Sequence, residues 1–370
     1  AKKYPDIDMP TVITQIAGRK VAAEKIPSWW EIEKIWYPKH LSLEQCSSEI
    51  TARYKARLLQ GDSLTDLTGG FGIDCSFLAT GFKSATYVER QEELCEIAAH
   101  NFPVLNLNHI NIKNEDGVTY LQAMSPVDCL FLDPARRNEH GGKTVAISDC
   151  EPNVAELEEL LLQKANRVMI KLSPMLDLSL ALKELKQTQE VHILSVNNEC
   201  KELLILLGQT SPAEISIHCV NLFTKGTQKE QHFVFTREQE QCSECTYTDS
   251  LETYLYEPNA SLLKAGAFRS IAAAYPVRKL HPNSHLYTSD TFIENFPGRI
   301  FRIVNQCSFN KKEVKENLAD LKKANVTVRN FPATVAELRK RLHLTEGGDT
   351  YLFASTLNNG QKVIIRCEKV

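Results

Sequence analysis

The middle of the chain alternates short apolar runs with longer stretches in which apolar residues recur every three or four positions. The short runs predict strands, and the stretches at 90–101, 152–165 and 176–186 predict helices. Strands that alternate with helices are typical of a parallel, doubly wound α/β sheet. The predicted strands are, in chain order, SLTDL, SATYVE, HINIKN, VDCLFLD, RVMIKL and VHILSVN. Two further runs, AEISIHCVNLF and EQHFVFT, have no helix between them and predict an antiparallel hairpin at the sheet edge.

The pattern differs on either side of this α/β region. Residues 1–60 have apolar residues at helical spacing and predict an N-terminal helical region. Residues 238–250 are polar and predict a linker. Beyond them, strand, helix, strand, helix and a closing strand pair predict a small α+β domain. With 370 residues the chain exceeds one compact domain, and we expect boundaries at 1–60, 61–240 and 250–370.

Composition narrows the class of protein. Hydrophobic residues make up 43% and charged residues 24%, which is ordinary for a soluble globular protein, and no apolar run could span a membrane. The first ten residues lack the apolar segment of a secretory signal. Eleven scattered cysteines are typical of buried thiols in a reducing compartment, so we expect a cytoplasmic protein. Only Cys242 and Cys245 have metal-ligand spacing, and because a zinc site needs about four ligands, we expect no metal.

The stretch DLTGGFGID, residues 66–74, predicts a glycine-rich turn between a strand and a helix. A dinucleotide fingerprint would need a third glycine where Cys75 stands, and a triphosphate loop would need the sequence GxxxxGK[ST], which is absent. S-adenosylmethionine (SAM) needs only close backbone approach and an acceptor for its ammonium group. Asp66 can provide that acceptor, so the turn favours SAM.

Three more acids follow predicted strands. Glu89 comes 19 residues after Gly70, where an acid can accept from ribose hydroxyls, and Asp116 follows the third strand, where it could accept from the adenine amino group. Asp133 ends the fourth strand in the sequence FLDPARR. Because ligands of open α/β sheets bind at the carboxyl edge of the strands, these acids together indicate one ligand site.

The chain resembles a bacterial family of class I SAM-dependent methyltransferases with a THUMP-like C-terminal domain. The matching stretches span residues 26–370 and include LSLEQCSSEITARYKA, DLTGGFGID, YVER, DPARR, DCEPN, IKLSPMLD, NECKELL, YEPNASLLKAG and LRKRL followed by LTEGGDTYLFA. The resemblance implies a Rossmann-like methyltransferase sheet, SAM as the methyl donor and, since THUMP domains are associated with RNA binding, an RNA substrate such as a tRNA or rRNA base. We expect the cofactor to be bound by Asp66, Thr68, Gly70, Phe71, Gly72, Glu89, Arg90, Asp116 and Gly117.

Asp133 and Pro134 match the start of the (D/N)PP(Y/F) motif of enzymes that methylate amines, and we expect them to form the catalytic site. Ala135 replaces the second proline and Arg136 the aromatic residue, which weakens the case for nitrogen methylation. DPAR is also similar to the DPPR of enzymes that methylate uridine at C5. Those enzymes need a cysteine nucleophile, whereas IKLSPMLD offers Ser173, so covalent catalysis is disfavoured.

Substrate contacts are expected from basic and hydroxyl side chains near the same edge and in the last domain. Residues 298–343 carry eleven Lys/Arg and four Asp/Glu, while the whole chain has a net charge of −3, and such asymmetry indicates a polyanionic partner. The candidates are Arg136, Arg137, Lys171, Ser173, Lys201, Arg339 and Arg341. A methyltransferase acting on a protein or small molecule, or a module that binds SAM and RNA without catalysis, fits the same residues.

Overall fold

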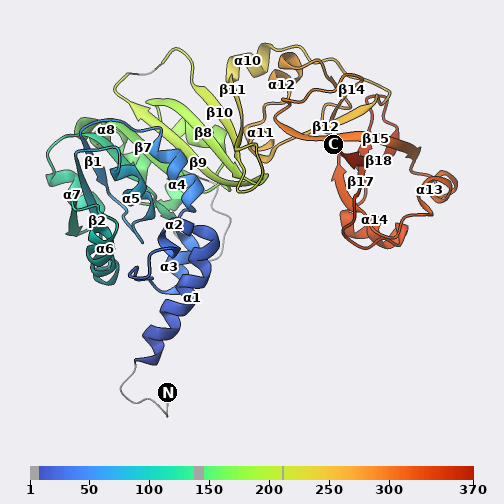
Figure 1. Cartoon of the computed structure of the whole chain (residues 1–370). Helices are drawn as coiled ribbons and strands as arrows, with labels where there is room; N and C mark the ends of the chain where they lie inside the picture. The colour runs from blue at the N-terminus through green and yellow to red at the C-terminus, as the bar shows by residue number, and fades with distance from the viewer. Residues whose placement is uncertain (1–7, 137–145, 211) are drawn as a thin grey trace. The chain divides into compact units, whose positions relative to one another are not determined.

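The computed structural model describes residues 8–136, 146–210 and 212–370. Contacts divide the chain into two compact units, which Figure 1 shows coloured by residue number. The first contains the described residues up to Val196 together with Lys201–Ile215, and the second contains Asn197–Cys200 and Ser216–Val370. The domain boundaries expected from the sequence stay a prediction.

The first unit opens with four helices and continues as alternating strands and helices. Its elements are α1 (Met9–Lys25), α2 (Pro27–Trp30), α3 (His40–Gln45), α4 (Glu49–Ala56), β1 (Ser63–Asp66), α5 (Ile73–Ala79), β2 (Ser84–Glu89), α6 (Glu92–Val104), β3 (Ile110–Asn114), α7 (Gly117–Ala123), β4 (Val127–Leu132), β5 (Ala135–Arg136), β6 (Cys150–Glu151), α8 (Val154–Lys164), β7 (Ala165–Leu172), α9 (Leu178–Glu184), β8 (Thr188–Val196) and β9 (Glu199–Gly208).

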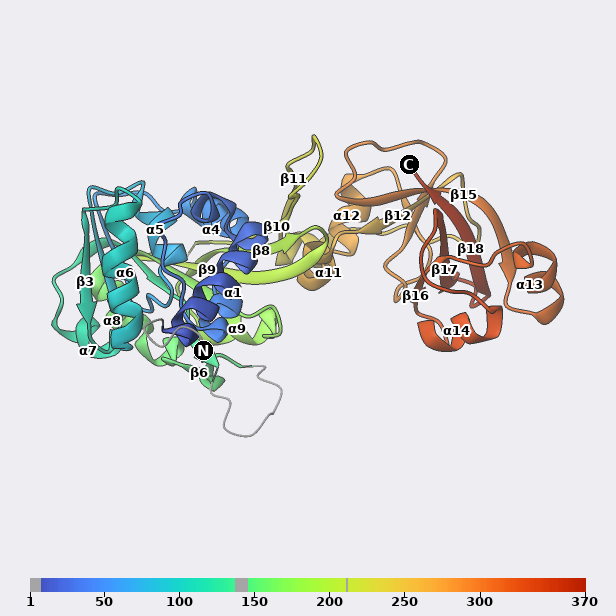
Figure 2. The ribbon, with the colours of Figure 1, turned by 60° about the horizontal axis from the view of Figure 1, so that its bottom comes forward.

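Seven strands of this unit lie in one sheet in the order β8-β9-β7-β4-β1-β2-β3, and β5 pairs with β6 separately. The pairs from β7 through β4, β1 and β2 to β3 are parallel, and β9 runs antiparallel to β7. The strand order reverses at β1, which pairs with β2 on one side and β4 on the other. In open α/β sheets the ligand crevice lies at this switch point, outside the carboxyl ends of the strands. The doubly wound fold predicted from the sequence is confirmed. Helix α6 packs against β2 and β3, and Figure 2 shows it beside β3.

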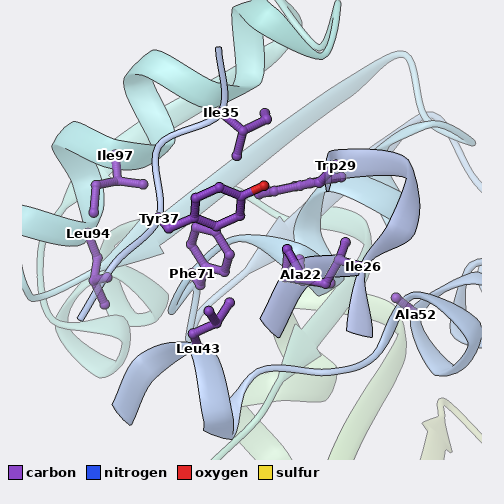
Figure 3. Packing of buried hydrophobic residues seen from close by; sticks show 11 residues of the cluster. Ala22, Ile26, Trp29, Ile35, Tyr37, Leu43, Ala52, Phe71, Leu94 and Ile97 are labelled. Carbon is purple, nitrogen blue, oxygen red and sulfur yellow. The ribbon is translucent and has the colours of Figure 1, made fainter. Parts of the chain in front are cut away.

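The N-terminal helices pack against the glycine-rich turn through Phe71. The Trp29 ring meets Phe71 edge to face with centroids 5.2 Å apart, and the Tyr37 ring lies 6.3 Å from it. Figure 3 shows these rings in one cluster with side chains from α1, α3 and α6. Asn101 of α6 also binds the backbone of Trp36 twice, at 2.9 Å each. The N-terminal helices are therefore part of the core around the turn.

The second unit contains a hairpin, a group of short helices and a seven-stranded sheet. Its elements are β10 (Ser216–Leu222), β11 (Glu230–Thr236), α10 (Arg237–Cys242), β12 (Tyr254–Pro258), α11 (Ala260–Ala265), α12 (Arg269–Ala274), β13 (Arg278–Lys279), β14 (Tyr287–Ser289), β15 (Gly298–Ser308), α13 (Lys311–Leu318), β16 (Asn325–Arg329), α14 (Val335–Leu342), β17 (Thr350–Thr356) and β18 (Lys362–Lys369).

Strands β10 and β11 form the antiparallel hairpin predicted from the sequence. The large sheet has the order β13-β14-β12-β15-β18-β17-β16, with β16 and β17 parallel. From β15 onward the order of strands and helices follows the prediction.

The predicted linker at 238–250 contains a helix. Thr236 and Gln239 form a reciprocal capping box at the start of α10, which satisfies backbone groups that would otherwise lack partners. The Glu240 carboxylate accepts hydrogen bonds from the backbone N–H groups of Phe268, Arg269 and Ser270. The polar composition of this segment predicted a linker without a helix. Composition alone does not show that its polar side chains cap α10 and bind the backbone at residues 268–270.

No helix among the described residues is long and apolar enough to cross a membrane. All eleven cysteines lie in the described part of the chain and all are free thiols, seven of them buried. Burial raises the pKa of several of these thiols, Cys367 and Cys219 among them, which disfavours the reactive thiolate form of these side chains.

Candidate active site

The turn between β1 and α5 depends on three glycines. Gly70 has φ 53° and Gly72 has φ 85°, left-handed conformations that only glycine adopts readily. A Cβ on Gly69 would lie 2.2 Å from the Tyr87 ring. Two glycines are thus required by backbone conformation and the third by close packing on β2.

Asp66, the last residue of β1, is almost fully buried at the start of this turn. Its Oδ1 accepts a hydrogen bond from the backbone N–H of Thr68 at 3.0 Å. Its Oδ2 is also buried and has no hydrogen-bond partner among the described residues. Burial raises the pKa of this carboxyl to about 8. Since a buried polar atom without a partner is costly, Asp66 Oδ2 is suited to accept from a ligand N–H group.

Glu89, at the end of β2, is buried beside the turn. Its Oε2 accepts from the backbone N–H of Gly70, and its Oε1 accepts from that of Gln91, both at 2.9 Å. The side chain therefore ties the glycine-rich turn to the second strand. Its predicted contact with a ribose stays a prediction.

Asp116 precedes α7 and caps it. Its Oδ1 accepts from the backbone N–H groups of Val118 and Thr119, at 3.0 Å each, and the side chain is exposed. A Cβ on Gly117 would lie 2.2 Å from the Leu67 carbonyl oxygen, so α7 begins in contact with the loop after β1. Gly117 therefore lies beside the loop that follows β1, and the predicted contacts of Asp116 and Gly117 with the cofactor stay predictions.

Two other predicted cofactor residues make contacts of a different kind. The Phe71 side chain is buried between Trp29 and Tyr37, so a cofactor could contact this residue only through its backbone. Arg90 follows β2 and forms an exposed ion pair with Glu151 at 3.3 Å.

Asp133 follows β4 and is connected to the glycine-rich turn. Its backbone N–H donates to Thr68 Oγ1 at 2.6 Å, and the next residue, Pro134, is buried. The Asp133 side chain is 38% exposed. Arg136 belongs to β5, which pairs with β6, and Arg137 lies outside the described residues.

Lys171, near the end of β7, joins Asp133 to a buried ion cluster. Its Nζ lies 2.7 Å from Asp133 Oδ2, 3.1 Å from Asp74 Oδ2 and 2.9 Å from Ser47 Oγ. Its side chain is only 8% exposed. Lys171 was predicted to contact substrate, but the structure uses its ammonium group to bind other side chains of the protein.

A second lysine completes this cluster from α4. Lys55 is fully buried, with its Nζ 2.6 Å from Glu202 Oε2, 2.9 Å from Asp74 Oδ1 and 2.8 Å from Ser47 Oγ. The Ser47 hydroxyl donates to Asp74 Oδ2 at 2.7 Å. The buried ion cluster thus consists of Lys55, Lys171, Asp74, Glu202 and Ser47, with Asp133 at its more exposed end.

The charges of this cluster stabilise one another. Burial alone would raise the pKa of Asp74, but Lys171 and Lys55 outweigh it and lower that pKa. Burial opposes the charge of Lys171, yet Asp133 and Asp74 raise its pKa well above the ordinary value. For Asp133, burial outweighs the attraction of Lys171 and raises the pKa. Asp133 therefore combines access to solvent with a proton affinity above that of a free carboxylate.

Only part of this cluster has a signal in the sequence. Asp74 stands two residues after Gly72 at the start of an apolar helix, a position at which a buried acid needs a cation. Lys55 lies in ARYKARLL, where nothing distinguishes it from its basic neighbours. Its partner Glu202 is distant in sequence, so only the packing of α4 against the sheet reveals the pair.

Ser173 and Lys201 lie at the same end of the sheet by strand position. Ser173 follows β7, and its Oγ accepts from the backbone N–H of Met175 at 3.2 Å. Lys201 is an exposed residue near the start of β9, adjacent to Glu202. Their predicted substrate contacts stay predictions.

Arg339 and Arg341 lie on α14 in the second unit. Arg339 pairs with Glu346 at 3.1 Å, and the Arg341 guanidinium carbon lies 4.0 Å from the centre of the Phe309 ring. Arg341 is exposed and Arg339 is half-buried. Arg341 is therefore better placed to meet a ligand.

Two family models match the C-terminal part of the chain: a ferredoxin-like domain over residues 254–297 and a THUMP domain-like family over residues 298–369. No curated protein matches the chain. Among solved structures, a protein described as a "putative methyltransferase" from Porphyromonas gingivalis W83 is 36% identical, with a TM-score of 0.89 over 99% of this chain and 92% of that chain.

More distant structures match only part of this chain. An rRNA methylase from Streptococcus thermophilus is 14% identical, with a TM-score of 0.31 over 43% of this chain and 93% of that chain. A "putative methyltransferase" from Streptococcus mutans, solved in complex with SAH, is 14% identical, with a TM-score of 0.32 over 43% of this chain and 96% of that chain. Neither similarity is strong enough to bear on function.

The Porphyromonas gingivalis protein is different, because its similarity extends over nearly the whole of both chains. The family that it represents combines the methyltransferase sheet with the THUMP-like C-terminal part. The chain therefore belongs to this family of class I methyltransferases with a C-terminal THUMP-like domain.

Proposed function

We propose that the chain transfers a methyl group from SAM to RNA. The observation that carries the proposal is the buried, unpartnered Oδ2 of Asp66 at a glycine-rich turn, in a chain that belongs to a methyltransferase family. An ammonium group is the ligand that such a carboxylate oxygen accommodates best, because it supplies both charge and N–H donors. SAM carries an ammonium group and supplies an electrophilic methyl group on a sulfonium.

The residues around the turn fit the remaining parts of SAM. Gly70 and Gly72 keep the turn free of side chains, so the backbone can approach a ligand closely. Glu89 would accept from the ribose hydroxyls, and Asp116 would accept from the adenine amino group. In this assignment Glu89 has two roles, since it also binds the backbone N–H of Gly70.

Asp133 would bind the acceptor group of the substrate. It is close to the turn, because its N–H donates to Thr68 Oγ1, and its side chain is the most exposed of those in the ion cluster. Methyl transfer by direct displacement mainly requires that nucleophile and methyl group be aligned. The rigid attachment of Asp133 to Thr68 and Lys171 supports that alignment.

RNA is the proposed substrate because of the C-terminal part of the chain. The THUMP-like match covers residues 298–369, and residues 298–343 hold an excess of seven positive charges. A basic surface attracts the phosphate backbone without regard to sequence. Arg341 on α14 is exposed there and would contribute to binding.

The decisive experiment measures transfer of radioactive methyl from SAM to an extract of a strain that lacks this gene. The products are separated into RNA, protein and small molecules. We expect label in RNA with the wild-type protein and none with Asp133→Ala. Label in protein or small molecules would contradict the RNA assignment, and no label in any fraction, with SAM binding intact, would contradict the proposed activity.

A further inference from the structure

We propose that the atom methylated is a hydroxyl oxygen, which in RNA is the 2′-hydroxyl of a ribose, and that the Asp133 carboxylate, oriented by Lys171, accepts its proton. This inference rests on the proposed function and names the acceptor at the same site. It is carried by the contact between Lys171 Nζ and Asp133 Oδ2 at 2.7 Å and by the cluster behind it.

The acceptor atom decides whether a proton acceptor is needed. An amine on a base needs its N–H groups oriented by hydrogen-bond acceptors, a task that an amide oxygen performs as well as a carboxylate. A neutral hydroxyl is a weak nucleophile and becomes a strong one only as its proton leaves. A site for hydroxyl groups therefore needs a positioned general base, whereas a site for amines does not.

Asp133 has the properties of that base. Its side chain is 38% exposed, whereas Lys171, Asp74 and Glu202 have side chains at most 10% exposed. A substrate can thus reach Asp133 but not the cluster behind it. Burial of the carboxyl raises its pKa above the ordinary value, which strengthens it as a proton acceptor.

Lys171 keeps this base ionised and fixed. Its ammonium contacts Asp133, Asp74 and Ser47 at once, so it has little freedom to turn toward solvent. Lys55 holds Asp74 and Glu202 from the other side. Burying charged groups is costly unless each is paired. A carboxylate that only accepts hydrogen bonds from an amine does not require such a cluster, whereas a base that must stay ionised and fixed does.

The sequence after Asp133 agrees with an acceptor on the sugar. No Phe, Tyr or Trp occurs between Asp133 and Ile147. A base that enters an active site is commonly held by stacking on such rings. A ribose hydroxyl at the edge of the backbone needs no stacking residue there.

The step balances with a sulfonium methyl donor. A lone pair of the hydroxyl oxygen forms the new bond to the methyl carbon, and the carbon–sulfur bond breaks with its electron pair left on sulfur. The hydroxyl proton passes to the Asp133 carboxylate and then to water. The products are a methyl ether, a neutral thioether and one released proton.

Alkaline digestion of the labelled RNA distinguishes the two acceptor classes. Alkali cleaves RNA through attack by the 2′-oxygen, so a 2′-O-methyl group protects the adjacent phosphodiester bond. We expect the label in alkali-resistant dinucleotides. Label in mononucleotides would overturn the hydroxyl assignment while leaving the RNA methyltransferase intact, and unlabelled RNA would overturn both.

A conservative substitution tests the base. Asp133→Asn keeps an acceptor oxygen but cannot take a proton. We expect turnover to fall by about 100-fold or more, with SAM affinity in calorimetry within about threefold of wild type. Asp128→Asn, at the other end of β4 and bound to the backbone of Asp62 and Ser63, is the matched control and should retain activity. Undiminished turnover in Asp133→Asn would indicate an amine acceptor.

The role of Lys171 is tested by the pH dependence of turnover. The charged groups around Asp133 are Lys171, Lys55, Asp74 and Asp66. Removing the ammonium in Lys171→Met should raise the pKa of Asp133, so the rising limb of the rate profile should move to higher pH. Lys171→Arg should restore the limb toward its original position. A uniform loss of activity at every pH would mean that Lys171 serves stability alone.

Discussion

Lys171 Nζ lies 2.7 Å from Asp133 Oδ2 and connects the carboxyl ends of β7 and β4. The backbone N–H of Asp133 donates to Thr68 Oγ1, which connects the same strand end to the turn after β1. Asp133 is thus held through its side chain by one neighbouring strand and through its backbone by the other. Precise positioning of this kind is what direct group transfer requires of a protein.

Removing Lys55 should destabilise the fold. In Lys55→Met the carboxylates of Asp74 and Glu202 lose a buried cation, and we expect the free energy of unfolding to fall by about 3 to 5 kcal/mol. Urea denaturation measures the change. Lys39→Met is the matched control, since Lys39 pairs with Glu93 in an exposed ion pair that should contribute little. Equal losses in both variants would contradict the buried ion cluster.

Glu89→Ala should weaken SAM binding. The substitution removes acceptors for charge-assisted hydrogen bonds, each worth about 1.5 to 3 kcal/mol, so the dissociation constant should rise by about 10- to 150-fold. Isothermal titration calorimetry measures it. The control is Glu96→Ala, an exposed position on α6. Unchanged affinity in the Glu89 variant would place the ribose elsewhere.

The sequence predicted the sheet and the strand ends because both are local signals. Short apolar runs alternate with stretches whose apolar residues have helical spacing, and this alternation indicated the doubly wound fold. The glycines at 69, 70 and 72 indicated the turn. Asp66 and Glu89 end β1 and β2, Asp133 follows β4, and Asp116 precedes α7. Backbone topology brings them to one edge without help from distant packing.

What the sequence did not reveal depends on packing between distant segments. Lys171 was predicted to contact substrate, whereas its ammonium group binds Asp133 and Asp74 within the protein. Phe71 sits in the middle of the glycine-rich turn, but its ring packs on Trp29 of the N-terminal helices. Neither arrangement produces a local pattern, because the partners are far apart along the chain.

Reversing charges on the C-terminal domain should weaken RNA binding. Lys322, Lys323 and Arg341 are exposed, and replacing all three by Glu should raise the dissociation constant for RNA. The slope of log affinity against log salt concentration should fall by about one for each phosphate that the variant no longer neutralises. Lys225→Glu, an exposed change in the same unit but outside the basic stretch, is the control. An unaltered slope in the triple variant would exclude these residues from the RNA site.

Asp66→Asn should weaken SAM binding and should stabilise the fold relative to wild type as the pH rises. Burial raises the pKa of Asp66 to about 8, so between roughly pH 4 and pH 8 the folded protein holds a proton that the unfolded chain has lost. Stability therefore falls as pH rises through this window. Asn cannot ionise, and it keeps the acceptor for the Thr68 N–H. The variant should gain stability relative to wild type on going from pH 5 to pH 8, by an amount on the order of 3 kcal/mol.

Thermal unfolding at pH 5 and pH 8 measures this gain in stability. Calorimetry at pH 8 should show that the variant binds SAM more weakly, by about tenfold or more, because a neutral amide pairs poorly with an ammonium group. Asp128→Asn is the control, since backbone hydrogen bonds lower the pKa of Asp128 and its contribution to stability is constant between pH 5 and pH 8. A gain of equal size at both pH values would mean that Asp66 is ionised throughout. If Asp66 is already ionised, SAM binding below pH 8 should release no proton from its carboxyl group. If Asp66 is protonated, SAM binding below pH 8 should release one.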